Sequence, residues 1–179
     1  MFQTKNTFKI ACTYFCTGWI QCWRCLFTYL PVILDDSYSD NLDLARQTKA
    51  IYARDNALIK QFSICSDIVK VKLFKAYCSS FYCSQLWTSF SSVSLRKLKS
   101  AYNRILRNLF RLPKESSMSA VCIDLDIDCF ELIVRKSIFN FRCRIFGSEN
   151  VIIQAICSSK YFYHCDLTMT WNKLLFSLN

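Results

Sequence analysis

Apolar residues recur at spacings of three and four from about residue 39 onward, which is the period of an α-helix with one buried face. Ser39 or Asp40 is placed to cap a first helix that runs to about Phe62. This stretch alternates apolar and polar faces without glycine or proline. The pattern therefore predicts that the chain after residue 39 is largely helical.

A second helix begins after Ser66 and is apolar on most of its sides, which is typical of a buried central helix. We expect it to run to about Trp87 or Phe90. The serine-rich stretch Ser91–Ser94 then forms a break.

A third helix is predicted from about Ser94 to Leu112, and its two faces differ sharply. One side is apolar, with Leu106 and Phe110 at its flanks. Its members are Leu95, Leu98, Ala101, Tyr102, Ile105, Leu109 and Leu112. The other side is cationic and almost free of acids, and its members are Arg96, Lys97, Lys99, Arg104, Arg107 and Arg111. The helix is thus expected to bury one stripe and expose the other.

A further helix is expected from about Cys129 to Phe146, ending at Gly147. Together these patterns predict an all-α fold, an irregular bundle of about five helices with at most one short strand near Leu30–Leu34. We divide the chain into a hydrophobic, cysteine- and aromatic-rich extension (1–28), a helical region (29–159) and a tail without assigned structure (160–179).

Composition excludes several classes of site. Only two glycines occur in 179 residues, which excludes phosphate-cradling and dinucleotide-binding loops, because these need several glycines close together. The single histidine, His164, excludes zinc sites that need two. Most of the 12 cysteines are interpreted as small buried hydrophobic residues of a reduced compartment.

The N-terminal residues raise two alternatives. Two apolar runs lie between residues 10 and 34, each shorter than the ~20 residues that a spanning helix needs. A hydrophobic extension packed on the rest of the chain is favoured, and a membrane-associated protein anchored by residues 10–34 is the alternative function. Cys12, Cys16, Cys22 and Cys25 have poor spacing for zinc, so no metal or other cofactor is expected.

The net charge of +10 is concentrated in the middle of the chain. Residues 64–115 carry ten basic and two acidic side chains, whereas residues 1–40 and 116–179 are each neutral. Six cations on one helix face repel one another unless an anion lies nearby. Contact with a nucleic-acid backbone is the favoured interpretation, and a solvated face or anionic lipid are the alternatives.

The order of several segments resembles the thumb-like and downstream helical region of non-LTR (LINE-type) retrotransposon reverse transcriptases. These segments are Tyr29–Leu34, Ala45–Gln47, Tyr52–Ile59, Phe62–Cys65, Val69–Cys78, Phe81–Trp87, Lys97–Asn103 and Arg111–Pro113. The resemblance covers about residues 29–157. It implies that the basic helix packs against the backbone of a template–primer duplex, nonspecifically and in a salt-sensitive way.

Three departures from the family bear on activity. Pro31 stands where the family has glycine, and residues 1–28 do not resemble the palm. Asp35-Asp36 imitates the family's aromatic-x-Asp-Asp box, but Ile33 replaces the aromatic residue, and too few residues precede the pair to supply the partner carboxylates. We therefore expect a truncated fragment of an RNA-directed DNA polymerase, not an enzyme on its own, with an intracellular location (nucleus or cytoplasm). A translated remnant without a selected role is a further alternative.

Two other clusters receive structural interpretations. Asp124, Asp126 and Asp128 resemble the opening of a calcium loop, yet Cys129 and Arg135 replace its glycine and glutamate. We expect these acids at the start of the following helix, where they complement its dipole. The pair His164-Cys165 lacks an orienting third group and is not expected to be catalytic.

Overall fold

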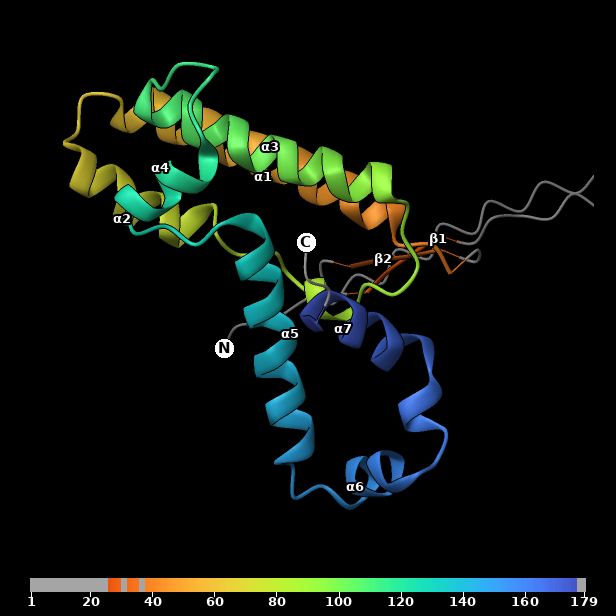
Figure 1. Cartoon of the computed structure of the whole chain (residues 1–179). Coiled ribbons are helices and arrows are strands. Elements are labelled where there is room, and N and C mark those ends of the chain that lie inside the picture. The colour runs from red at the N-terminus through yellow and green to blue at the C-terminus, as the bar shows by residue number, and fades with distance from the viewer. Residues whose placement is uncertain (1–25, 30–31, 36–37, 177–179) are drawn as a thin grey trace, which may run out of the picture.

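The computed structural model describes residues 26–29, 32–35 and 38–176, drawn in colour in Figure 1. An antiparallel pair of strands, β1 (Leu26–Tyr29) and β2 (Val32–Asp35), precedes the helices. The α-helices are α1 (Asn41–Phe62), α2 (Asp67–Tyr77), α3 (Ser92–Phe110), α4 (Met118–Asp124), α5 (Phe130–Phe146), α6 (Val151–Ser158) and α7 (Asp166–Phe176). Two short 3-10 helices, η1 (Ser84–Leu86) and η2 (Phe162–His164), complete the described elements.

The expected all-α class is confirmed, while two details of the count differ. The described residues form seven α-helices instead of about five, because α4, α6 and α7 have only 7 to 11 residues each and such short stretches establish no clear helical period. A second strand accompanies the expected one, since a single strand leaves its backbone hydrogen bonds unpaired. The residues from 160 onward, which had no predicted structure, contain η2 and α7.

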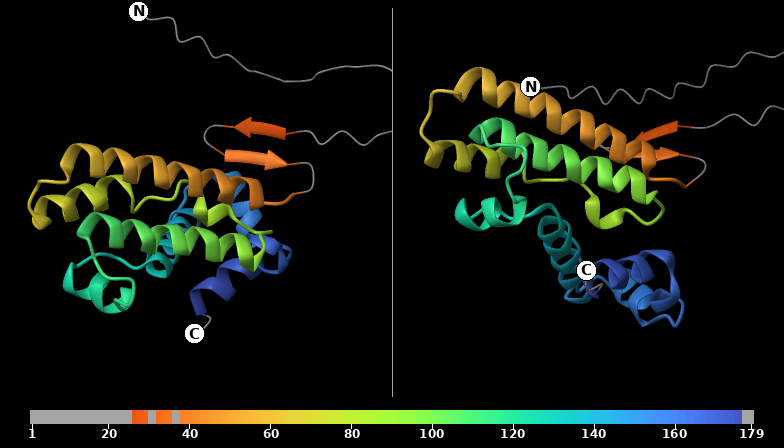
Figure 2. Two further views of the ribbon diagram at one scale, coloured as in Figure 1. Left: turned by 90° about the horizontal axis from the view of Figure 1, so that it is seen from above. Right: turned by 45° about the horizontal axis from the view of Figure 1, so that its top comes forward.

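Helices α1 and α3 lie side by side and run in the same direction (Figure 2). The amide of Ser91, at the start of α3, donates to Asn41 Oδ1 (2.9 Å), and near the other end Asn108 Nδ2 donates to Asp55 Oδ2 (3.4 Å). Between these contacts, buried apolar residues recur at a spacing of seven on α1 and at spacings of three and four on α3. The fully buried members are Leu44, Ile51, Leu98, Ala101, Tyr102, Ile105 and Leu106. This parallel pair forms the core of the helical body.

The second helix ends much earlier than predicted. Helix α2 stops at Tyr77, and only Lys70 and Phe74 along it are buried, so it is not the central buried helix that its composition indicated. Residues 78–91, named here the connecting segment, then return to the start of α3. Cys83 within this segment has a left-handed backbone (φ 60°), which a continuous right-handed helix cannot contain.

Side chains on one face of α1 hold the connecting segment in place. Asp43 has no exposed surface and Gln47 is almost completely buried. The contacts are Thr88 N and Ser89 N to Asp40 Oδ2 (2.7 and 2.9 Å), Trp87 Nε1 to Asp43 Oδ2 (3.1 Å), and Gln47 Nε2 to the Tyr82 carbonyl (2.9 Å). Arg46 also forms an ion pair with Asp43 (2.7 Å). These contacts replace the regular hydrogen bonds that a helix would have supplied here.

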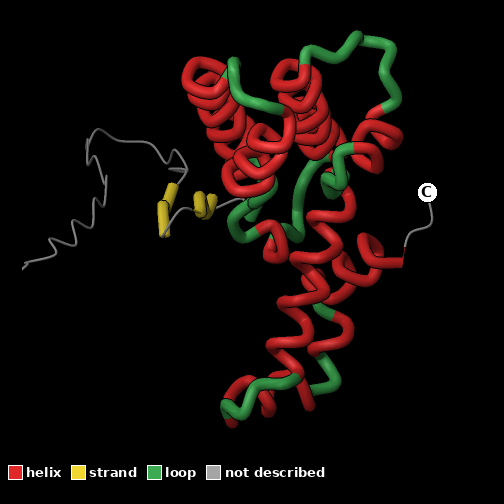
Figure 3. The backbone as a smooth tube through the Cα atoms, turned by 90° about the vertical axis from the view of Figure 1, so that its left-hand side faces the viewer, coloured by secondary structure: helices red, strands yellow, loops and turns green. Residues whose placement is uncertain are grey.

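Helices α5 and α7 dock on the same segment from the other side. The ring nitrogen of Trp171 donates to the Gln85 carbonyl (2.7 Å), and Ser137 Oγ donates to Gln85 Oε1 (3.0 Å). Trp171 also packs edge-to-face on Phe141. In Figure 3 several loop segments, in green, lie between the helices at the top and the long helical column below, and other loops lie at the top and bottom of the view. The connecting segment therefore joins α1 to α5 and α7.

Replacing Trp171→Phe tests this attachment. Phe is smaller than the buried Trp171 and cannot donate to the part-buried Gln85 carbonyl, so the lost packing and the lost hydrogen bond should together cost at least about 1–3 kcal/mol in the free energy of unfolding. Urea unfolding followed by circular dichroism measures this loss. Tyr163→Phe, at an exposed position, is the matched control and should change the free energy by less than about 0.5 kcal/mol. Equal effects of the two substitutions would contradict the assignment.

Candidate nucleic-acid interface

Helix α3 begins and ends within about two residues of its predicted bounds. Ser91 is its N-cap, and its hydroxyl accepts a hydrogen bond from the Ser94 amide (3.0 Å). Arg111 ends the helix in a left-handed conformation (φ 53°), and the Leu112 amide bonds back to the Arg107 carbonyl (2.9 Å). This arrangement satisfies carbonyl groups that the last turn would otherwise leave unpaired.

The predicted apolar stripe of α3 is confirmed by burial. Its central members face α1 and α5 and are almost inaccessible, whereas Leu95 and Leu112 at its ends are half-buried. Leu106, expected at the flank, is fully buried as well. Tyr102 packs its ring between Phe74 and Phe130, and its hydroxyl donates to the Asp128 carbonyl (2.6 Å). The helix is therefore fixed in its rotation about its own axis.

The six predicted basic residues lie on the outer side of α3, but they differ in burial and in their ion-pair partners. Lys99 forms an ion pair with Glu131 of α5. Arg107 is half-buried, and its Nη2 donates weakly to the Ser116 carbonyl (3.5 Å). The remaining four, named here the cationic face, are exposed and form no ion pair with any described residue. They are Arg96, Lys97, Arg104 and Arg111.

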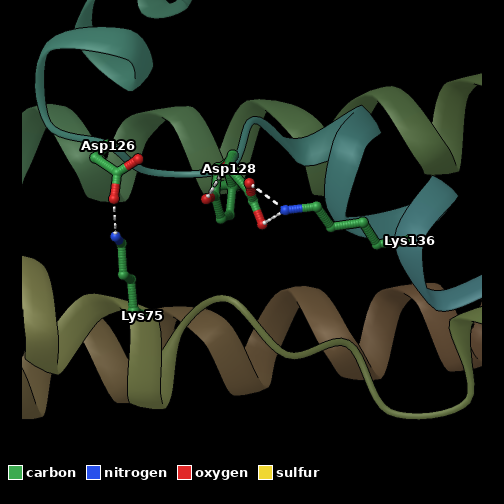
Figure 4. Close-up of polar contacts among 5 residues, drawn as sticks. Lys75, Asp126, Asp128 and Lys136 are labelled. Carbon is green, nitrogen blue, oxygen red and sulfur yellow. Dashed lines mark hydrogen bonds and ion pairs between the residues drawn. The ribbon is translucent and has the colours of Figure 1, made fainter. Parts of the chain in front are cut away.

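The acidic cluster after α4 does not gather at the start of α5 as expected. Asp124 ends α4, and Asp126 lies in the loop, so only Asp128 directly precedes the N-cap of α5. Figure 4 shows that Asp126 pairs with Lys75 of α2 (2.8 Å) and Asp128 with Lys136 of α5 (2.6 Å). The reason is that α4 ends at Asp124, so that the three acids are divided among a helix end, a loop and a helix start. Asp126 and Asp128 are thus paired with cations that lie outside the cationic face.

A groove runs between α1 and α3 beside the cationic face. It has a volume of about 410 Å³. Its lining residues are Thr48 and Tyr52 from α1 and Val93, Arg96, Lys97 and Ser100 from α3. Sequence patterns alone did not reveal this groove, because it depends on the register of two helices that are 30 residues apart along the chain.

Asp55 is buried where α1 meets the far half of α3. Its Oδ2 accepts the bond from Asn108, while its Oδ1 is buried without a hydrogen-bond partner. Burial raises the pKa of Asp55, and the bond from Asn108 and the charge of Arg104 oppose this increase only in part. Arg104 therefore has a buried carboxyl as an electrostatic neighbour, though not as an ion-pair partner.

The other candidate sites remain apart or lie outside the described residues. Asp35 ends β2, and its neighbour Asp36 lies outside the described residues, as do Cys12, Cys16, Cys22 and Cys25. Residues 26–29, 32–35 and 38–176 contain no cluster of three or more potential metal ligands. The Cys165 thiol donates to the Phe162 carbonyl (3.1 Å). None of the helices that the structure describes has the length and apolar character to cross a membrane.

Comparisons with protein-family models, with curated protein sequences and with solved structures find no match to this chain.

Asp55→Asn should stabilise the protein at neutral pH. Because the pKa of Asp55 is raised in the folded state, its carboxyl favours folding when protonated and opposes it when ionised. The melting temperature of the variant should therefore equal that of the native chain below about pH 4 and exceed it increasingly as the pH rises. Melting curves between acid and neutral pH measure this difference.

Asp126→Asn is a control that should change the melting temperature in the opposite direction. The hydrogen bond and charge of Lys75 lower the pKa of Asp126, so its contribution is present above the ordinary carboxyl pKa and is lost as the pH falls. This variant should melt below the native chain at neutral pH and approach it in acid. If both variants shift in the same direction, the assignment of the buried Asp55 carboxyl is wrong.

Proposed function

We propose that this chain binds nucleic acid through its phosphate backbone, without reading base sequence, by means of the cationic face of α3. The observation that carries this proposal is that four exposed cations gather on one side of a single helix. Arg96, Lys97, Arg104 and Arg111 form no ion pair with any described residue, whereas Lys75, Lys99 and Lys136 have acidic partners. Such a cluster is stabilised when an anionic polymer lies against it.

The dimensions of the cationic face suit a polyanion. Arg96 and Arg111 are 15 residues apart, which corresponds to about 22 Å along the helix axis. That length corresponds to about six base-pair steps along the axis of a duplex, at roughly 3.4 Å each. Three of the four cations are arginines, whose planar group fits phosphate oxygens better than an ammonium does. The resemblance to the thumb-like region of LINE-type reverse transcriptases supports the same polymer, a template–primer duplex.

The proposed role of the cationic face is to position the chain on a duplex and not to catalyse a reaction. Backbone contacts fix where a protein lies on a duplex and carry no sequence information directly. In this proposal the chain corresponds to a part of a reverse transcriptase that holds a duplex.

Salt dependence provides the test. Affinity for a short RNA–DNA duplex should fall steeply with salt, with a slope of about −3 to −4 in log affinity against log salt if four phosphates are contacted. Changing Arg96, Lys97, Arg104 and Arg111 together to Gln should remove most of that slope. Fluorescence anisotropy of a labelled duplex measures both quantities.

A control variant with equal loss of charge separates a local surface from net charge. Lys60, Lys72, Lys160 and Lys173 are exposed on other elements, and their joint replacement by Gln should leave most of the affinity and slope in place. Equal losses in the two variants would indicate attraction by net charge alone. Salt-insensitive binding by the native chain, or no binding at all, would overturn the proposal.

A further inference from the structure

The groove between α1 and α3 combines cations with unengaged hydroxyl groups. Arg96 and Lys97 line it on one side, and no acidic residue is among its lining residues. The hydroxyls of Tyr52 and Ser100, two further lining residues, form no hydrogen bond with another described residue. The Thr48 hydroxyl, in contrast, already donates to the Leu44 carbonyl (2.8 Å). Arg96 Nε donates to the Ser92 carbonyl (3.3 Å), which leaves the two terminal nitrogens of its guanidinium as donors. Two hydroxyl-bearing side chains without a partner and two cations without an ion pair therefore line one groove.

The parallel arrangement of the two helices brings these groups together. Thr48 and Tyr52 are four residues apart on α1, and Arg96 and Ser100 are four apart on α3, so each pair lies on one face of its helix. Since α1 and α3 run side by side in the same direction, the two faces line opposite walls of the groove. A ligand in the groove can thus be approached by donors from both walls.

We infer that this groove binds one phosphate group and holds a single phosphodiester of the bound strand at a fixed position along α3. The inference rests on the proposed function and deepens it, because it distinguishes one seated phosphate from the others that meet only exposed cations. A phosphate offers several strong acceptor oxygens, which matches a set of donors from an arginine, a lysine and two hydroxyls. The volume of about 410 Å³ leaves room for the sugar that carries the phosphate.

Removing the two hydroxyls tests the inference without changing any charge. The double variant Tyr52→Phe with Ser100→Ala should bind a short RNA–DNA duplex about tenfold more weakly, which corresponds to the loss of hydrogen bonds to a charged group. Its salt slope should stay at the native value, since the number of cations is unchanged. Tyr77→Phe with Ser119→Ala removes two exposed hydroxyls outside the groove and should leave the affinity unchanged.

The outcomes separate this inference from the proposed function. If the groove variant binds as tightly as the native chain while binding remains salt-sensitive, the groove inference is overturned and the proposed function stands. If the native chain shows no salt-sensitive binding, the proposed function fails, and titration with inorganic phosphate then decides the groove by itself.

This titration follows backbone amide resonances by NMR and uses the native chain, so it does not depend on the folding of a variant. Amides of Tyr52, Arg96, Lys97 and Ser100 should shift with inorganic phosphate and not with chloride at equal ionic strength. The absence of these shifts, or equal shifts with both anions, would overturn the inference of a phosphate site.

Discussion

The burial of the Asp43 carboxylate between α1 and the connecting segment is the constraint on which the rest of the structure depends. A carboxylate without exposed surface is tolerated only when it is paired and hydrogen-bonded, and here Arg46 and the Trp87 ring nitrogen satisfy it. This contact, with those of Asp40 and Gln47, fixes a segment that lacks continuous secondary structure. Residues 78–91 in turn provide the carbonyl and side-chain groups that receive α5 and α7.

The position of α3 follows from the same contacts. The connecting segment brings Ser91 next to the first residue of α1, where the Ser91 amide donates to Asn41 Oδ1. Helix α3 therefore begins beside the start of α1 and runs parallel to it. The apolar stripe of α3 then buries against α1, and Tyr102 fixes the rotation of the helix through its bond to the Asp128 carbonyl. The basic residues are left on the outer side as a consequence. The cationic face and the adjoining groove are therefore products of the packing and not of one local motif.

The sequence predicted the elements that depend on local signals. Helices α1, α3 and α5 were placed within about two residues, because each is long, periodic and preceded by a polar or small capping residue. The early end of α2 was missed because it depends on partners in α1 and on the left-handed Cys83. The division of the basic residues into paired and unpaired ones was missed for the same reason, since it depends on tertiary partners. Lys99 is neutralised by Glu131, 32 positions away, which no helical period reveals.

The central claim is tested most directly by the free energy of unfolding of Asp43→Ala, measured by urea denaturation. Removing Asp43 leaves the partly buried Arg46 and the buried Trp87 ring nitrogen without their acceptor, so we expect a loss of about 3–5 kcal/mol. Lys136→Ala breaks the ion pair with Asp128, in which both side chains are more than a third exposed, and should cost less than about 1 kcal/mol. A loss for Asp43→Ala as small as that for Lys136→Ala would show that the buried Asp43 contact does not hold the structure together.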